Sequence, residues 1–228
     1  MAARRKQQLP SGDRKPTRKQ ARKSKAVEAK RELYRQLILD GAERAFAERG
    51  YDDTKMEHIA AESGLSMGTV YSVFPGKAKI FSAVHEAADA ELLRRGLECF
   101  HDGMTALERL LAGVRAYVEY FIEHPDFLRM ELNEGLAWGA EAEARGGKRS
   151  HARREGLELM KRSVANCIEE GSFIDADAEL VARTMIAMQQ VQLAYWLEGG
   201  MERAREAVVS DVTEQVKRSF CAPGASGD

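Results

Sequence analysis

The fold of this chain is decided by residues 54–77, which read TKMEHIAAESGLSMGTVYSVFPGK. Thr54 and Glu57 have the spacing of a capping box, in which each side chain bonds a free backbone N–H of the other residue, so a helix is expected to start at Thr54. Gly64 is expected to end that helix in the left-handed conformation. Ser66 can cap a second helix directly after the turn. The pattern predicts a helix-turn-helix.

The second helix of this motif has two different faces. Its inward face is apolar, at Val70, Val73 and Phe74. No acidic residue occurs from 64 to 84, so the outward face can approach phosphate. The alternative is an ordinary helical hairpin inside an all-α core. The outward face consists of Met67, Gly68, Tyr71 and Ser72.

From about Arg31 to His85 the chain resembles the DNA-binding domain of the TetR family of bacterial transcription regulators. The matching pieces are AERAFAERGYDDT at 42–54, IAAESGLSMGTVYSVFPGK at 59–77 and KIFSAV at 79–84. The resemblance covers about a quarter of the chain. It implies a homodimer that binds a near-palindromic operator, as a repressor, and is released by a small molecule.

The resemblance also assigns DNA contacts. It implies phosphate contacts from Thr54, Tyr71 and Lys77, and Lys55 joins this predicted DNA-binding set. The chain departs from the family pattern where Met67 replaces a basic or polar residue and where Ser72 and Val73 replace a pair of His. Without Arg, Asn or Gln on this helix, thymine methyl contacts, hydroxyl groups and DNA shape must supply the specificity. The positions facing base edges are Ser66, Met67, Gly68, Thr69 and Ser72.

The charge of the chain is strongly asymmetric. Residues 1–35 contain 13 Lys and Arg against three acidic residues, although the whole chain has a net charge of −1. Residues 1–28 also contain almost no large apolar side chains beyond Leu9 and Val27, so we expect a basic disordered arm, with a possible helical continuation from about Lys23. Three interpretations of this arm stay open. It reads the minor groove of DNA, it is a solvated tail, or it is a transit peptide. The arm residues assigned to DNA are Arg14, Lys15, Arg18, Lys19, Arg22 and Lys23.

The remaining sequence predicts helices throughout, and hence an all-α fold. We expect the DNA-binding domain at 29–76, a helical ligand-binding and dimerisation domain at 77–221, and a disordered tail at 222–228. A long helix that begins near Gly76 joins the two domains. Five further helices are expected in this domain. One ends at His124, one spans about 126–138, one ends at Gly171, and the last two span 178–197 and 202–220; a loop is expected at 139–148.

The candidates for a ligand site are aromatic, Met and polar residues of the second domain. Most such residues in a helical protein simply fill the core. Gln189 and Gln192 are more informative, because buried amides need partners, from a ligand or from the dimer interface. The candidates are Tyr117, Phe121, Phe127, Met130, Glu134, Trp138, Met160, Met188, Gln189, Gln192 and Trp196.

The last two helices predict a dimer interface. Residues 178–197 are apolar on nearly every side, so this helix must be covered all round. Residues 202–220 have a narrow apolar stripe that suits one partner helix. The two helices are therefore expected to pair with their copies across a two-fold axis, as the family resemblance also implies. The predicted seam is Val208, Val212, Val216 and Phe220.

The sequence gives little support for an enzyme, a metal site or a cofactor. The five His are scattered, and the three Cys are widely spaced, which suits free thiols in a reducing bacterial cytosol. We expect no catalytic residues, no cofactor and no membrane segment. The alternatives to a ligand-responsive, nucleoid-associated regulator are an architectural DNA-binding protein without a ligand, and an enzyme or receptor with a vestigial DNA domain.

Overall fold

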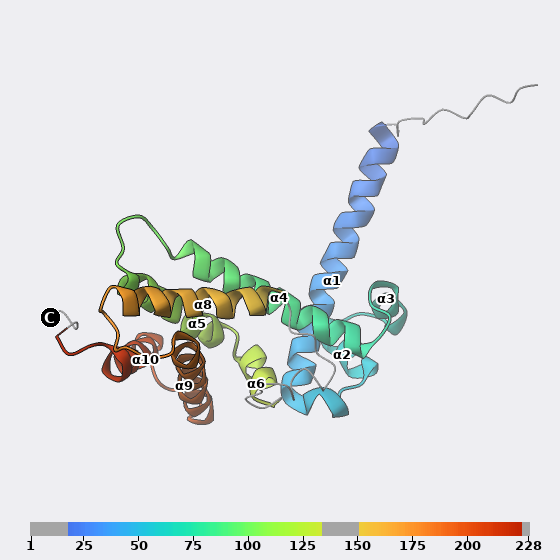
Figure 1. The fold of residues 1–228 in the computed structure, drawn as a ribbon. Helices are drawn as coiled ribbons and strands as arrows, with labels where there is room; N and C mark the ends of the chain where they lie inside the picture. The colour runs from blue at the N-terminus through green and yellow to red at the C-terminus, as the bar shows by residue number, and fades with distance from the viewer. Residues whose placement is uncertain (1–17, 134–150, 225–228) are drawn as a thin grey trace, which may run out of the picture.

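The computed structural model describes residues 18–133 and 151–224, and within them the regular structure is helical apart from one isolated bridge between Phe173 and Cys221. Figure 1 shows α1, α2 and α3 at one end of the molecule, α5, α8, α9 and α10 at the other, and α4 and α6 reaching from one group to the other. The helices are α1 (Arg18–Asp53), α2 (Met56–Ser63), α3 (Met67–Val73), α4 (Lys77–Glu98), α5 (Ala106–Glu123), α6 (Pro125–Asn133), α8 (His151–Glu169), α9 (Ala178–Glu198) and α10 (Arg205–Phe220).

The predicted helix-turn-helix is confirmed by α2 and α3. Gly64 ends α2 with a φ of 65°, and Ser66 caps α3 by accepting a hydrogen bond from the Thr69 backbone N–H at 3.2 Å. The apolar face of each short helix packs on α1, where Ile59 and Val70 are fully buried. Three helices thus share one small core and hold α3 at the surface.

The contact between α1 and α2 depends on Gly41 of α1. A Cβ on Gly41 would lie 2.5 Å from Ser63 Oγ and 2.6 Å from the Ser63 backbone nitrogen. The close approach therefore depends on a residue of α1, outside the helix-turn-helix.

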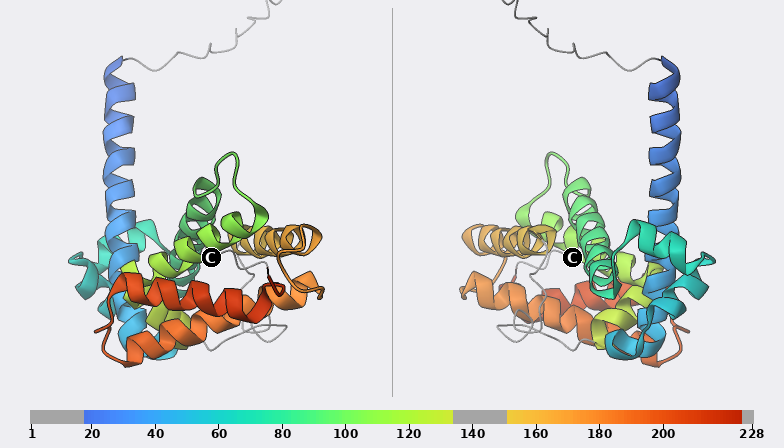
Figure 2. Two further views of the ribbon diagram at one scale, coloured as in Figure 1. Left: turned by 90° about the vertical axis from the view of Figure 1, so that its left-hand side faces the viewer. Right: turned by 90° about the vertical axis from the view of Figure 1, so that its right-hand side faces the viewer.

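The first helix starts earlier than expected. Residues 18–28, part of the predicted arm, form the beginning of α1, which runs as helix to a break at Gly50. In Figure 1 and in both views of Figure 2 this N-terminal half stands clear of the rest of the protein. The helix breaks at Gly50, whose φ of 71° and ψ of 173° are not helical. The prediction of disorder is wrong for 18–22, the predicted helical continuation from about Lys23 is present, and residues 1–17 lie outside the described part.

The larger end of the molecule is built around α4, α5 and α8. Helix α8 packs on α4, α5 and α9, while α10 packs on α5 and α9. Helix α6 lies between the two ends, because it packs on α1 as well as on α5 and α9. The Asn133 side chain strengthens that junction by donating a hydrogen bond to the Ala47 carbonyl at 3.2 Å.

The predicted dimer seam on α10 is wrong. Val208, Val212 and Val216 are at most 2% exposed within the single chain, because this stripe packs on α5 and α9. Phe220 is half-buried and lies against Phe173, with ring centroids 5.9 Å apart. The partner helices that the stripe required are therefore helices of the same chain.

Helix α9 instead has an apolar face that nothing in the described chain covers. Leu180, Val191 and Tyr195 are 65%, 57% and 71% exposed. Their spacing places them along one side of the helix, together with the half-buried Ala187 and Met188. Across the described ranges, no helix combines the length and apolar character needed to cross a membrane.

Candidate DNA-binding surface and ligand cavity

The outer face of α3 is the surface on which the predicted base-reading residues lie. Ser66, Gly68, Tyr71 and Ser72 are exposed, and Met67 and Thr69 are half-buried. Most of the small hydroxyl groups are occupied locally. Ser66 Oγ lies 2.9 Å from Thr69 Oγ1, and Ser72 Oγ donates to the Thr69 carbonyl at 2.7 Å. Tyr71 is thus the largest exposed side chain on this face.

Thr54 does not have the role expected of it. Lys55, not Thr54, is the N-cap of α2, and His58 Nδ1 accepts a hydrogen bond from its backbone N–H at 3.2 Å. Thr54 is 1% exposed, and its hydroxyl donates to the carbonyls of Ala45 and Gly50 at 3.0 and 2.6 Å. The predicted capping box is therefore wrong, and the Thr54 side chain is turned away from any DNA surface. Lys55 itself is exposed.

Lys77, the other predicted phosphate contact, joins the start of α4 to the end of α1. Its ammonium group donates to the carbonyls of Tyr51 and Asp52 at 2.6 and 3.1 Å and lies 4.3 Å from the centre of the Tyr51 ring. The charge therefore satisfies carbonyl groups at a helix C-terminus, where a cation is favourable. In this conformation Lys77 fixes the orientation of α4 on the small domain.

The predicted arm is divided between described and undescribed residues. Arg14 and Lys15 lie outside the described part. Arg18, Lys19, Arg22 and Lys23 belong to the projecting half of α1. Lys25, Lys30 and Arg31, farther along that half, are exposed. The basic residues from Arg18 onward therefore lie on a helix that continues into the core formed by α1, α2 and α3.

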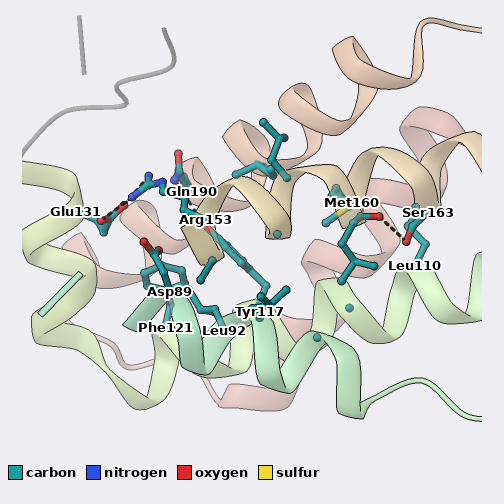
Figure 3. A pocket seen from close by; sticks show the side chains of 18 of the residues that line it. Asp89, Leu92, Leu110, Tyr117, Phe121, Glu131, Arg153, Met160, Ser163 and Gln190 are labelled. Carbon is teal, nitrogen blue, oxygen red and sulfur yellow. Dashed lines mark hydrogen bonds and ion pairs between the residues drawn. The ribbon is translucent and has the colours of Figure 1, made fainter. Parts of the chain in front are cut away.

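A cavity of about 150 Å³ lies between α4, α5 and α8, close to α6 and α9. Figure 3 shows side chains from these helices directed into it. Four predicted ligand residues line the cavity: Tyr117, Phe121, Phe127 and Met160.

The other predicted ligand residues lie elsewhere. Gln189 is fully buried but is not part of the cavity lining, and Trp196 donates its Nε1–H to the Arg203 carbonyl at 3.3 Å. Met130 is buried in the core. The half-buried Met188 and Gln192 also lie outside the lining. Glu134 and Trp138 fall outside the described residues.

Three glycines give the cavity its space. Gly96, Gly113 and Gly156 are within α4, α5 and α8, and all three line the cavity. A Cβ added at Gly113 or Gly156 would meet nothing within 4 Å, and one at Gly96 would lie 3.9 Å from Leu159. A glycine within a helix costs about 0.5–1 kcal/mol relative to alanine. The hollow therefore exists because side chains are absent from three facing helices, a pattern that widely separated glycines did not reveal in the sequence.

One end of the cavity has a half-buried ion pair that sequence reasoning missed. Arg153 makes two hydrogen bonds to Glu131, at 3.2 and 3.1 Å, and His85 Nδ1 lies 3.0 Å from Glu131 Oε1. Burial opposes ionisation of Glu131, but the hydrogen bond to His85 and the charge of Arg153 outweigh it and lower the pKa of this carboxyl group to about 2. Glu131 is thus a carboxylate at neutral pH and links α6 to α4 and α8.

The same end of the cavity contains Asp89, Tyr117 and Gln190 (Figure 3). Gln190 Nε2 lies 3.5 Å from the Tyr117 hydroxyl, while Gln190 Oε1 is buried without a hydrogen-bond partner. Burial raises the pKa of Tyr117 well above its usual value. The opposite end, with Leu110 and Met160, is mostly apolar. The acidic side chains therefore gather at one end of the cavity, while Arg109 and Ser163 also line it. In the described ranges no group of three or more His, Cys, Asp or Glu is placed to hold a metal ion.

Comparisons with known proteins agree with this arrangement. Residues 38–84 match the family described as bacterial regulatory proteins, tetR family. An uncharacterized HTH-type transcriptional regulator, YuxN of Bacillus subtilis, is 29% identical over 99 residues, which are 43% of this chain and 34% of that protein. The fatty acid metabolism regulator protein of the same organism is 31% identical over 84 residues, 37% of this chain and 43% of that protein. The chain thus spans less than half of the length of these two curated relatives.

The solved structures extend the likeness to the whole fold. The ketosteroid transcriptional regulator KstR2 of Mycobacterium tuberculosis superposes with a TM-score of 0.69 at 23% identity, covering 82% of this chain and 95% of that one. At this identity the superposition establishes the common fold.

Proposed function

Because this chain carries a TetR-family helix-turn-helix domain, we propose that the protein is a homodimeric transcription regulator, acting as a repressor, that binds a near-palindromic operator and is released by a small molecule. The DNA-binding domain is assigned to residues 29–76 and the ligand-binding and dimerisation domain to 77–221. In the dimer, the two α3 helices enter successive major grooves about 34–36 Å apart. Tyr71 and Lys55 contact phosphates, and the exposed face of α3 contacts base edges.

One observation supports release by a ligand: the helices that line the cavity are also the helices that contact the DNA-binding domain. Helices α4 and α6 both pack on α1. Asp89 of α4 and Glu131 of α6 line the acidic end of the cavity. A molecule that favours a different separation of these two helices therefore favours a different position of α3.

The exposed apolar strip of α9 supports a dimer, because a second copy of the chain can cover it. Leu180, Val191 and Tyr195 form an apolar strip more than half exposed, and a second copy of the same strip, related by a two-fold axis, covers it. This seam replaces the one expected on α10. The strip lies on the domain that contains the cavity, so a change in the cavity can alter the separation of the two α3 helices.

The test is selection of genomic fragments by the purified protein, followed by binding measurements on the selected and on unrelated duplexes at physiological salt. A regulator binds its operator at least about a thousandfold more tightly than unrelated DNA. Equal affinities would instead indicate an architectural DNA-binding protein, which the projecting basic half of α1 favours. The Gly113→Phe variant fills the cavity, so it is expected to bind operator normally and to lose the response to effectors extracted from the source cells.

A further inference from the structure

We infer that the effector is an unbranched amphiphile with an anionic head group, which inserts its apolar chain into the cavity and keeps the head group at the end where Arg109 meets solvent. This inference rests on the proposed ligand-binding role of the cavity and names both the class of ligand and its orientation.

The first observation is that the cavity meets solvent at its apolar end. Among the described residues that line the cavity, Arg109 is the one that is exposed, and the others are buried or half-buried. It directly precedes Leu110, at the end that Figure 3 shows with Met160 and Ser163. Within residues 18–133 and 151–224, no hydrogen bond or ion pair involves its guanidinium group. A ligand that fills the cavity can therefore reach this cation while its head group stays in water.

The acidic side chains at the start of α5, near Arg109, are engaged elsewhere. Glu108 accepts hydrogen bonds from the backbone N–H and the hydroxyl of Thr105 at 2.8 and 3.0 Å. Glu170 accepts one from the Ala106 backbone N–H at 3.0 Å. Both carboxylates thus lie at the positive end of the helix dipole, which offsets their charge. The planar guanidinium group of Arg109 remains available, and its geometry matches a carboxylate.

The second observation is that the polar groups at the acidic end are already engaged. Glu131 is held by two hydrogen bonds from Arg153 and by His85 at 3.0 Å. Asp89 is 7% exposed and is likewise not free. Gln190 Oε1 is inaccessible, so it faces no ligand. A charged head group placed here would have to break these pairs and lose its water, so the chain of the ligand points to this end.

The third observation concerns the shape and the size of the cavity. Arg109, Gly113, Tyr117 and Phe121 recur every four residues along α5 and all line the cavity, so the space follows this helix from one end to the other. An engineered apolar cavity of about the same volume, 150 Å³, holds the six carbons of benzene. An elongated space of this volume suits an unbranched chain. Heptanoate, which has six carbons behind its carboxylate, is therefore the probe.

The first experiment is calorimetric titration of the full chain at pH 7.5, where heptanoate is ionised. Each buried CH₂ group strengthens binding about fourfold, so pentanoate is expected to bind about fifteenfold more weakly than heptanoate. Heptanedioate has the same length but would have to bury a second carboxylate at the acidic end, so it is expected to show no binding. Heptanedioate that binds as tightly as heptanoate overturns the orientation.

Two charge reversals on α5 test the contact with the head group. Arg109→Glu replaces attraction by repulsion, so heptanoate is expected to bind about tenfold more weakly, while heptan-1-ol is hardly affected. Arg115→Glu is the matched control, because Arg115 is exposed on the same helix but does not line the cavity. It should leave both affinities unchanged. Equal losses of heptanoate in the two variants, or equal losses of both compounds in Arg109→Glu, overturn the assigned role of Arg109.

The Gly113→Phe variant distinguishes failure of this inference from failure of the proposed function. If both compounds bind, Gly113→Phe abolishes that binding and Arg109→Glu weakens neither, the cavity is a ligand site and only the head-group assignment is wrong. If neither compound binds the unchanged protein, or if Gly113→Phe binds both equally well, both the inference and the ligand-responsive part of the proposed function fail.

Discussion

Gly41 determines how closely α1 and α2 can approach, so it gives a sharp test of the small domain. In Gly41→Ala the new Cβ would lie within 3 Å of backbone atoms of Glu62 and Ser63, and the helices must separate. We expect a loss of about 1–3 kcal/mol in the free energy of unfolding, measured in urea. Gly113→Ala is the control, because its Cβ meets open space and should stabilise its helix. Equal effects of the two variants would show that Gly41 makes no such contact.

Glu43 gives the protein a pH-dependent stability at the junction of the two ends. Burial, followed by the charges of Asp126 and Asp40, raises the pKa of this carboxyl group from 4.5 to about 7. The folded state therefore prefers the protonated form. The resulting stability is full below pH 4.5 and is lost as the pH rises to about 7.

Replacing Glu43 tests this assignment. Glu43→Gln cannot ionise and should be more stable than the unchanged protein at pH 8, by about 1–2 kcal/mol after allowance for partial solvent screening. At pH 4 the two proteins should be nearly equally stable. The measurement is urea unfolding at several pH values. A difference that does not vary with pH would mean that Glu43 ionises normally.

Some residue roles were predictable and others were not, for a physical reason. Ser66 caps α3 through the Thr69 backbone N–H three residues away, so a local pattern was enough. Thr54 has an equally good local pattern, but its hydroxyl bonds the carbonyl of Ala45 on α1. A contact between two helices overrides the local preference, and one sequence contains no record of it.

The same limit applies to whole helices. The apolar stripe of α10 correctly required a partner helix, yet a stripe does not say whether that partner belongs to the same chain or to another. Helix α9 was expected to be covered all round, and the described chain covers only part of it. The cavity was harder still, because it depends on glycines of α4, α5 and α8 that are far apart in the sequence.

The exposed strip of α9 leads to a prediction about assembly. Val191→Glu combined with Tyr195→Glu should give monomers in sedimentation velocity, because each two-fold interface would bury four unpaired carboxylates. The control places the same two charges at Ala87 and Ala90, which are exposed on α4. A doubly substituted α9 that still sediments as a dimer would exclude this strip as the seam.

This chain joins a basic N-terminal segment to an acidic remainder. Deleting residues 1–28 removes ten Lys and Arg, and the residues of this segment whose side chains are described, 25–28, are exposed. Thermal stability should therefore hardly change. If the arm binds phosphates, the slope of log affinity against log salt should flatten by about 0.9 for each phosphate that the shortened protein no longer neutralises. An unchanged slope would identify the arm as a solvated tail.

The all-α fold and the order of its helices could be predicted, because helix periodicity, caps and glycine stops are local properties of the sequence. The direction of the arm could not, because it depends on whether the chain between the arm and the domain stays helical. In the structure it does, from Arg18 to the break at Gly50.

Because this helix is continuous, it fixes the rotation of the arm about the helix axis as well as its distance from the domain. From Arg18 to Gly50 the helix spans about 48 Å, and each residue turns it by about 100°. One residue inserted between Val27 and Glu28 would therefore rotate the part of the helix that precedes it, Lys25 included, by about a quarter of a turn relative to the domain. Seven inserted residues would bring it back to within about 20°. Operator affinity that falls with one inserted residue and recovers with seven would show that the arm approaches DNA with a fixed helical phase.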